Sequence, residues 1–237
     1  MKPPLNLTTE LVPLTYVEAL LELAHTFGVE RDALFAAARV KPQVLQHPNG
    51  RVSFIDFYLL AIAALQACHE PALGLLLGQR LNVSSHGILG YAVLASANLG
   101  QAIQFALKYY RVLGLTFDLE LIEHPERMEL RAIESMPMGP LTRFAAEGLL
   151  ASLYSIARFL VGVDLQGLTV GFAHAAPAYA ERYREIFGVA AQFDQPWHSL
   201  SMPKRYLAQP MALANPGTVQ MCEQQCEALL ATLAVQE

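Results

Sequence analysis

The chain has 237 residues, enough for one domain with a sizeable buried core and a short appendage. Hydrophobic residues make up 54% of the chain and charged residues 16%, so a large core or an internal pocket is expected. The net charge of −5 argues against a broad basic surface for nucleic acid, and the proline-containing N-terminus does not resemble a signal peptide.

The chain begins with a segment that has no regular pattern. Residues 1–13 contain three prolines and no hydrophobic periodicity, which predicts a loose arm. Thr15 and Glu18 have the spacing of a capping box, in which each side chain bonds a free backbone N–H of the first turn. An apolar stripe follows, so we expect a helix over 16–27.

The stretch 84–113 contains two apolar helical segments separated by a polar break. The Asn98 side chain is placed to accept a hydrogen bond from a backbone N–H of the second segment, and the Gln101 side chain to accept one from the backbone N–H of Asn98. This pattern predicts a corner between two helices. Gly87 and Gly90 lie on one face of the first segment. Close packing of another backbone is the simpler interpretation, and close approach of a bound molecule is the alternative.

The pattern changes after Gly114, where apolar and polar residues alternate and predict a β-hairpin over 115–134. Two amphipathic helices, over 141–161 and 177–188, and two more strands, over 168–174 and 191–202, are expected to follow the hairpin. The predicted class is α+β: an N-terminal helical layer packed with a small antiparallel sheet of about four strands and flanking helices.

These patterns divide the chain into a main domain over 14–208 and a C-terminal helix within 209–237. The main domain has a helical part over 14–113 and a mixed part over 114–208. Its longest apolar run, over 57–68, is shorter than the ~20 residues that cross a bilayer. We therefore expect no membrane span and a cytoplasmic location.

The C-terminal helix is expected to begin at Asn215 and Pro216. Its apolar stripe includes Cys222 and Cys226, which lie four apart. Their Cβ atoms would be ~5–6 Å from each other, too far for an unstrained disulfide. Together with Cys68, they are expected to be buried free thiols, and no metal site is expected.

Common catalytic motifs are absent from the sequence: there is no nucleophile elbow, phosphate loop, dinucleotide fingerprint or zinc-protease helix. The seven histidines are dispersed, and no pair has metal-ligand spacing. We expect neither an enzyme nor a cofactor. His86, which stands beside Gly87 at a helix start, is the most suggestive histidine.

A polar line on the helix over 141–161 includes Arg143 and Glu147. It is either a solvated face or one side of a cavity between sheet and helices, where Arg143 could hold a carboxylate and Glu147 an amine. Aromatic residues would supply the apolar wall that most ligand sites have. The candidate ligand-binding residues are His86, Tyr91, Tyr110, Phe117, Arg143, Glu147, Phe172 and Trp197.

Three ordered segments match a known pattern. They are HGILGYAVLASANLGQAIQFALKYYRVL, PAYAERYREIFGVAAQFDQPWHSLSMPKRYLAQPMALANP and CEQQCEALL. Together they resemble the N-terminal, arabinose-binding-like sensor domain of AraC/XylS-type regulators, in the branch of ornithine-utilisation and virulence regulators. The resemblance is best over about 84–230.

The resemblance implies a transcription regulator whose N-terminal domain binds a small-molecule effector and often forms a homodimer. In that family a C-terminal pair of helix-turn-helix units binds promoter DNA. Because this sequence ends at Glu237, promoter DNA is expected as a partner only through a domain outside the chain. The resemblance implies no catalytic residues.

Two alternatives remain at this point. A small-molecule enzyme or carrier using the same cavity would need Arg143, Glu147 and His86 to converge. A pure dimerisation module would instead bury an apolar helix, such as 217–235, against its twin.

Overall fold

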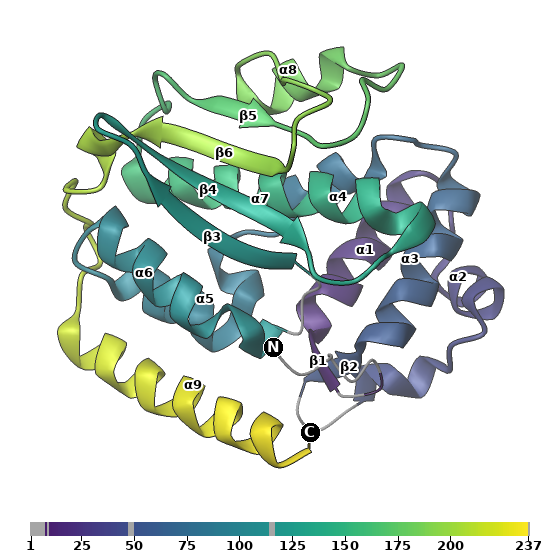
Figure 1. The fold of residues 1–237 in the computed structure, drawn as a ribbon. Coiled ribbons are helices and arrows are strands. Elements are labelled where there is room, and N and C mark those ends of the chain that lie inside the picture. The colour runs from purple at the N-terminus through teal and green to yellow at the C-terminus, as the bar shows by residue number, and fades with distance from the viewer. Residues whose placement is uncertain (1–7, 9, 47–49, 114–116, 237) are drawn as a thin grey trace.

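A computed structural model describes residues 8, 10–46, 50–113 and 117–236. Figure 1 shows a helical region beside a twisted sheet, with one long helix running between them. The α-helices are α1 (Leu14–Thr26), α2 (Arg31–Ala38), α3 (Phe54–Cys68), α4 (Leu73–Arg80), α5 (Gly87–Ala95), α6 (Leu99–Tyr109), α7 (Thr142–Val161), α8 (Glu181–Phe187) and α9 (Pro216–Gln236).

The main sheet has four antiparallel strands in the order β3-β4-β6-β5. The strands are β3 (Phe117–Glu123), β4 (Arg127–Glu134), β5 (Thr169–Gly171) and β6 (His198–Pro203). Helices α7 and α8 alternate with them along the chain. The predicted α+β class and its order of strands and helices are therefore confirmed.

The strand register places apolar side chains on one face of the sheet. Met128 of β4 pairs with Met202 of β6, and Leu130 pairs with Leu200 two residues further along. Because side chains alternate between faces, these four share one face. That face looks toward α5, α6 and α7 (Figure 1).

Strand β6 is shorter than the segment 191–202 predicted for it. Residue Gln192 forms only an isolated bridge with Gly171, and the regular strand begins at His198. Two residues account for the delay: Asp194 has a positive φ of 56°, and Pro196 has no N–H to donate to a ladder.

The prediction of a loose arm over 1–13 is wrong for its last four residues. Strand β1 (Glu10–Pro13) pairs with β2 (Arg51–Ser53) in a second, two-stranded sheet. The rest of the predicted arm, apart from Thr8, lies outside the described residues. So do residues 114–116, at the predicted start of the hairpin.

The predicted capping box of the first helix is also wrong. Because β1 leads directly into α1, the cap position falls on Pro13, which has no side-chain donor or acceptor. The Thr15 hydroxyl instead donates to the carbonyl of Ser85, 2.6 Å away. This bond connects α1 to the short 3-10 helix η2 (Val83–His86) in front of α5.

Other caps follow the sequence closely. The side chains of Ser53, Asn98 and Asn215 each accept a bond from the backbone N–H three residues on, at 2.9–3.1 Å. The Gln101 side chain also accepts a backbone hydrogen bond, but from the N–H of Ala97 rather than from that of Asn98. The predicted corner between α5 and α6 is confirmed.

Helix α7 is the central element of the fold. With the preceding 3-10 turn it forms the stretch Gly139–Val161, which by length and composition alone could cross a membrane. The helix lies against α4, α8 and β6, and 56% of its most apolar 18-residue segment is buried inside the protein. Burial in the core therefore accounts for its apolar character.

Helix α9 packs along α5 and along the 3-10 turn η3 (Tyr110–Leu113), as Figure 1 shows at the lower edge of the molecule. Its Cys222 and Cys226 are fully buried, and Cys226 packs in a cluster with Leu89 of α5 and Tyr110 of η3. All three cysteines are free and buried, as predicted.

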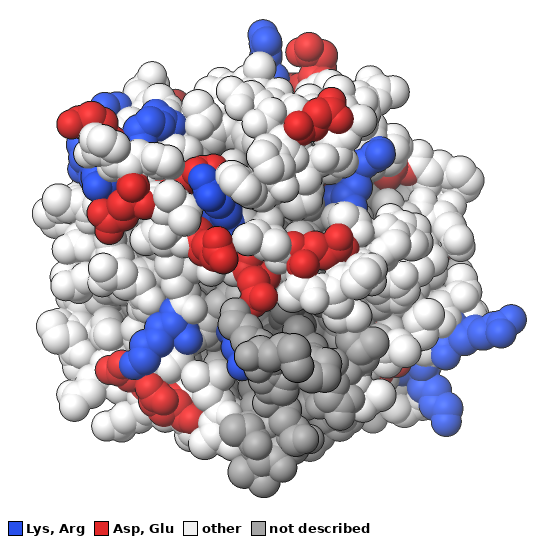
Figure 2. Space-filling view, viewed as in Figure 1, with Lys and Arg blue, Asp and Glu red and all other residues white. Residues whose placement is uncertain are grey.

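Acidic and basic side chains are interspersed over the face seen in Figure 2. Ion pairs among the described residues include Lys204 with Glu123 and Lys108 with Glu223. The visible face therefore has the mixed character expected from the net charge of −5.

Candidate functional site

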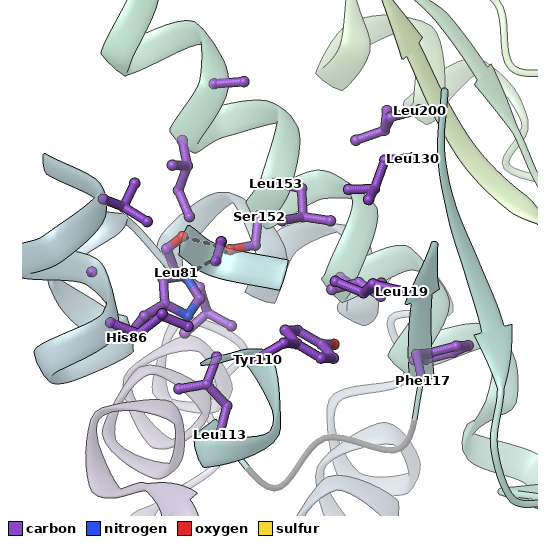
Figure 3. Close-up of a pocket in the computed structure, with 18 of the residues that line it drawn as sticks. Leu81, His86, Tyr110, Leu113, Phe117, Leu119, Leu130, Ser152, Leu153 and Leu200 are labelled. Carbon is purple, nitrogen blue, oxygen red and sulfur yellow. Dashed lines mark hydrogen bonds between the residues drawn. The ribbon is translucent and has the colours of Figure 1, made fainter. Parts of the chain in front are cut away.

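A cavity of about 200 Å³ lies between the sheet and the helices α5, α6 and α7. The apolar face of the sheet supplies one wall, through Phe117, Leu119, Met128, Leu130, Leu200 and Met202. The helices supply the other walls, through residues such as Leu89, Val93, Ala106, Leu149, Leu153 and Ile156. Figure 3 shows Phe117 and Leu119 on one side of the cavity and His86 on the other.

His86 joins three elements at the cavity wall. Its Nδ1 lies 2.5 Å from the Tyr16 hydroxyl of α1, and its Nε2 lies 3.2 Å from the Ser152 hydroxyl of α7. Ser152 in turn donates to the carbonyl of Leu81, 2.9 Å away (Figure 3). The imidazole therefore connects α1 and α7 at the start of α5.

Burial keeps this histidine neutral. Loss of hydration lowers the pKa of His86 to about 4, because the charged imidazolium is the form that water stabilises most. Burial likewise raises the pKa of the neighbouring Tyr16, which is opposed by the nearby Arg51 guanidinium. Both groups are uncharged at neutral pH, and the wall they form is polar but neutral.

Tyr110 is another polar residue that lines the cavity. It belongs to the 3-10 turn after α6, and its side chain is 8% exposed. Its hydroxyl has no hydrogen-bond partner among the residues that the structure describes. Burial is the main reason that the pKa of Tyr110 is raised, with contributions from Tyr16 and Asp118.

Three of the eight candidate residues line the cavity: His86, Tyr110 and Phe117. Tyr91 lies on α5 but is 54% exposed and points elsewhere. Phe172 is fully buried in a second core between α7, α8 and the sheet, where it contacts Tyr183 and Phe187. Composition alone could not distinguish a cavity wall from this solid aromatic core.

Trp197 lies on the other face of the sheet. Its ring stacks under the Arg131 guanidinium at 3.8 Å, and its Nε1 donates to Glu129. Burial tends to raise the pKa of Glu129, but the bonds from Arg131, His124 and Trp197 lower it to about 2. This group is an ion-pair cluster on the polar face and is separate from the cavity.

Glu147 is fully buried on a different face of α7. Its Oε1 accepts hydrogen bonds from Tyr179 at 2.7 Å and from Tyr183 at 2.5 Å. Burial raises the pKa of Glu147 to about 7, even though both phenols and the Arg143 charge favour the ionised form. Arg143 itself is exposed. Neither Arg143 nor Glu147 lines the cavity.

Of Arg143, Glu147 and His86, which an enzyme or carrier at this cavity would need together, only His86 lines the cavity. His86 contacts Tyr16 and Ser152, whereas Glu147 contacts Tyr179 and Tyr183 across the α7–α8 contact. Within the described part of the chain, no group of three or more His, Cys, Asp or Glu side chains is placed to hold a metal ion.

Sequence reasoning missed Tyr16 and Ser152 as members of the site. Both are 66 or more residues from His86 in the chain, so no local spacing connects them. Ser152 offered one signal, since it is a small polar residue in the apolar middle of α7 and is only 3% exposed.

The comparisons with known proteins agree on one family. Residues 28–211 match the model of the arabinose-binding domain found at the N-terminus of AraC transcription regulators. The chain is 70% identical to the ornithine utilization regulator of Pseudomonas aeruginosa over 237 residues, which is all of this chain and 70% of that protein. It is 21% identical over 224 residues to an uncharacterized HTH-type transcriptional regulator of Mycobacterium tuberculosis, covering 92% of this chain and 65% of that one.

A solved structure has the same fold. The transcriptional regulator CdpR from Pseudomonas aeruginosa superposes with a TM-score of 0.60 at 17% identity, over 85% of this chain and 60% of that chain. The chain thus spans about two thirds of the relatives that it matches. The predicted resemblance is confirmed, and the chain belongs to the family of arabinose-binding domains at the N-terminus of AraC transcription regulators.

Proposed function

We propose that this domain senses a small-molecule effector, which binds in the cavity between the helices and the sheet. The observation that carries the proposal is the cavity itself, whose walls come from both parts of the domain and include the polar side chains of His86, Tyr110 and Ser152. Ligand sites typically combine apolar walls with a few placed polar groups. The protein would act in the cytoplasm, without spanning a membrane and without catalysis.

Helix α5 gives the effector a way to influence the rest of the regulator. Its Leu89 and Val93 line the cavity, and α9 packs along the same helix. An effector shifts an equilibrium only when it binds two arrangements with different affinity. We propose that these arrangements differ in the position of α5 and hence of α9.

In the intact regulator, a C-terminal helix-turn-helix domain outside this chain would bind promoter DNA. We propose that the regulator acts as a homodimer, as the family resemblance implies. The buried stripe of α9, including Cys222 and Cys226, faces its own chain. The dimer contact therefore has to use another surface. Sedimentation that detects only monomers at all concentrations would exclude the homodimer.

The cavity proposal is tested by filling it. Ala106 of α6 lines the cavity, whereas Gln104 of the same helix is exposed. We expect A106F, but not Q104F, to abolish the thermal stabilisation that metabolites produce in a ligand screen. Ligand at 100 times its Kd stabilises the folded state by about 2.7 kcal/mol. If a metabolite stabilised A106F and Q104F equally, its binding site would lie outside the cavity.

A further inference from the structure

The hydrogen bonds around His86 use every available proton. With a neutral imidazole, Tyr16 donates to Nδ1 and Nε2–H donates to the Ser152 oxygen, whose own hydrogen goes to the Leu81 carbonyl. The tautomer follows from these partners, since Ser152 has one hydrogen to give. This side of the cavity therefore has no spare donor for a ligand.

The Tyr110 hydroxyl is in the opposite situation. It is buried, it lines the cavity, and it lacks a hydrogen-bond partner in the described part of the chain. Buried hydroxyls in native proteins nearly always have a partner, so each exception needs an explanation. Figure 3 shows the Tyr110 ring lying between His86 and Leu119, inside the group of lining residues. The hydroxyl end of the ring is directed toward the side of Leu119 and Phe117, which also line the cavity.

No Asp, Glu, Lys or Arg is among the described residues that line the cavity. The partly buried guanidinium of Arg51 is close to Tyr16, but its Nη1 donates to the carbonyls of Leu11 and Val112. A charged ligand group would lose its hydration without gaining an ion pair, which is strongly unfavourable. The cavity therefore favours an uncharged occupant.

The size of the cavity sets the size of the apolar part of that occupant. An engineered apolar cavity of ~150 Å³ stays dry and binds benzene. This cavity, of about 200 Å³, has room for a larger apolar body.

We propose that the cavity binds an uncharged, mostly apolar molecule that carries one hydrogen-bond acceptor, and that this acceptor receives the hydrogen of the Tyr110 hydroxyl. This inference rests on the proposed role of the cavity as the effector site. It names the chemical class of the effector: a neutral aliphatic or aromatic body with a carbonyl, ether or hydroxyl oxygen.

Four soluble probes test the class by isothermal titration calorimetry. Three of them, 2-octanone, octanoate and octylammonium, share an eight-carbon chain and differ in charge, and ornithine is the charged polar probe. We expect 2-octanone to bind and the three charged probes not to bind. A106F should abolish binding of 2-octanone.

The role of Tyr110 is tested by Y110F. We expect it to weaken binding of 2-octanone by about three- to tenfold, as for one hydrogen bond. Its folded state should be as stable as the wild type, because the lost hydroxyl had no partner. Y91F is the control, since Tyr91 is 54% exposed and does not line the cavity. It should bind 2-octanone as the wild type does.

Each contrary result has a distinct meaning. If octanoate, octylammonium or ornithine binds the wild type but not A106F, the uncharged class is overturned and the effector role of the cavity is left intact. Failure of 2-octanone to bind would also overturn the class. Equal affinity of Y110F and the wild type would overturn the role of Tyr110. The proposed function has a separate test. It fails if metabolites raise the thermal stability of A106F as much as that of Q104F.

Discussion

The Tyr16 hydroxyl and the His86 Nδ1, seventy residues apart in the chain, lie 2.5 Å from each other. The bond connects the first helix to the cavity wall, and the aromatic rings also meet edge to face. We expect Y16F to lower the free energy of unfolding by about 1–3 kcal/mol, because it leaves a buried ring nitrogen without its donor. Urea denaturation at pH 7.5 measures the loss.

The control for this prediction is Y58F. Tyr58 is only partly buried, and its bond to the Met138 carbonyl is long, at 3.3 Å. Its loss should cost less than about 1 kcal/mol. Similar losses in Y16F and Y58F would show that the His86 bond contributes nothing beyond an ordinary hydroxyl contact.

Glu147 makes stability depend on pH in a direction unusual for a carboxylate. Its folded pKa of about 7 is above the ordinary value of ~4.3, so the folded state holds a proton that the unfolded state releases. The contribution of this proton to the stability of the folded state is complete below about pH 4 and is lost as the pH rises through about 7. Between pH 5 and 8 we expect the wild type to lose roughly 2–3 kcal/mol relative to E147Q.

This difference is measured as the free energy of unfolding of both proteins across that pH range. His86 and His198 act in the other sense, since burial lowers the pKa of each to about 4 and the stability of the neutral forms is lost as the pH falls from about 6.5. Taking the difference between the two proteins cancels the histidines. Parallel curves for wild type and E147Q would mean that Glu147 is already ionised in the fold.

Local signals in the sequence predicted the elements that depend on neighbours in the chain. The alternation through Phe117 and Leu119 predicted a strand with one buried face, and Asn98 predicted a helix start, because each signal acts within a few residues. Strand β1 escaped prediction because its four residues, ending in Pro13, are stabilised by pairing with β2 some forty residues later.

The candidate site was less predictable for the same reason. The helical period placed Glu147 on a polar line of α7, but it could not tell whether that line faced the cavity or α8. Phe172 and Phe117 are equally apolar in sequence, yet one fills a core and the other lines the cavity. Contacts between distant segments, such as Tyr16 with His86, decide which residues belong to the site.

Two glycines at the contact between α4 and α7 are expected to respond differently to the same substitution. A Cβ on Gly78 would lie 2.4 Å from the Gly148 carbonyl oxygen and 2.7 Å from the Ala151 Cβ, so α4 would have to move away from α7. We expect G78A to destabilise the protein by about 1–3 kcal/mol, the usual cost of overpacking.

The matched variant is G148A. A Cβ there would meet only the Gly74 carbonyl oxygen, at an ordinary 3.4 Å. Since alanine favours a helix interior by up to about 1 kcal/mol over glycine, G148A should be neutral or stabilising. Thermal or urea unfolding distinguishes the two. Equal effects would mean that the α4–α7 contact adapts easily at both positions.

The proposed coupling of the cavity to α9 predicts a change far from the cavity. Helix α5 lies between them, and η3 carries Tyr110 on the cavity and also packs on α9. An occupant that orders α5 and η3 should therefore raise hydrogen-exchange protection in the α9 segment 221–230, because local opening of α9 would have to break contacts with both elements. We expect 2-octanone to slow exchange there by about threefold or more in the wild type and to leave A106F unchanged, as read by mass spectrometry of the peptides. Protection confined to α5 and α6 would show that the cavity and α9 are not coupled.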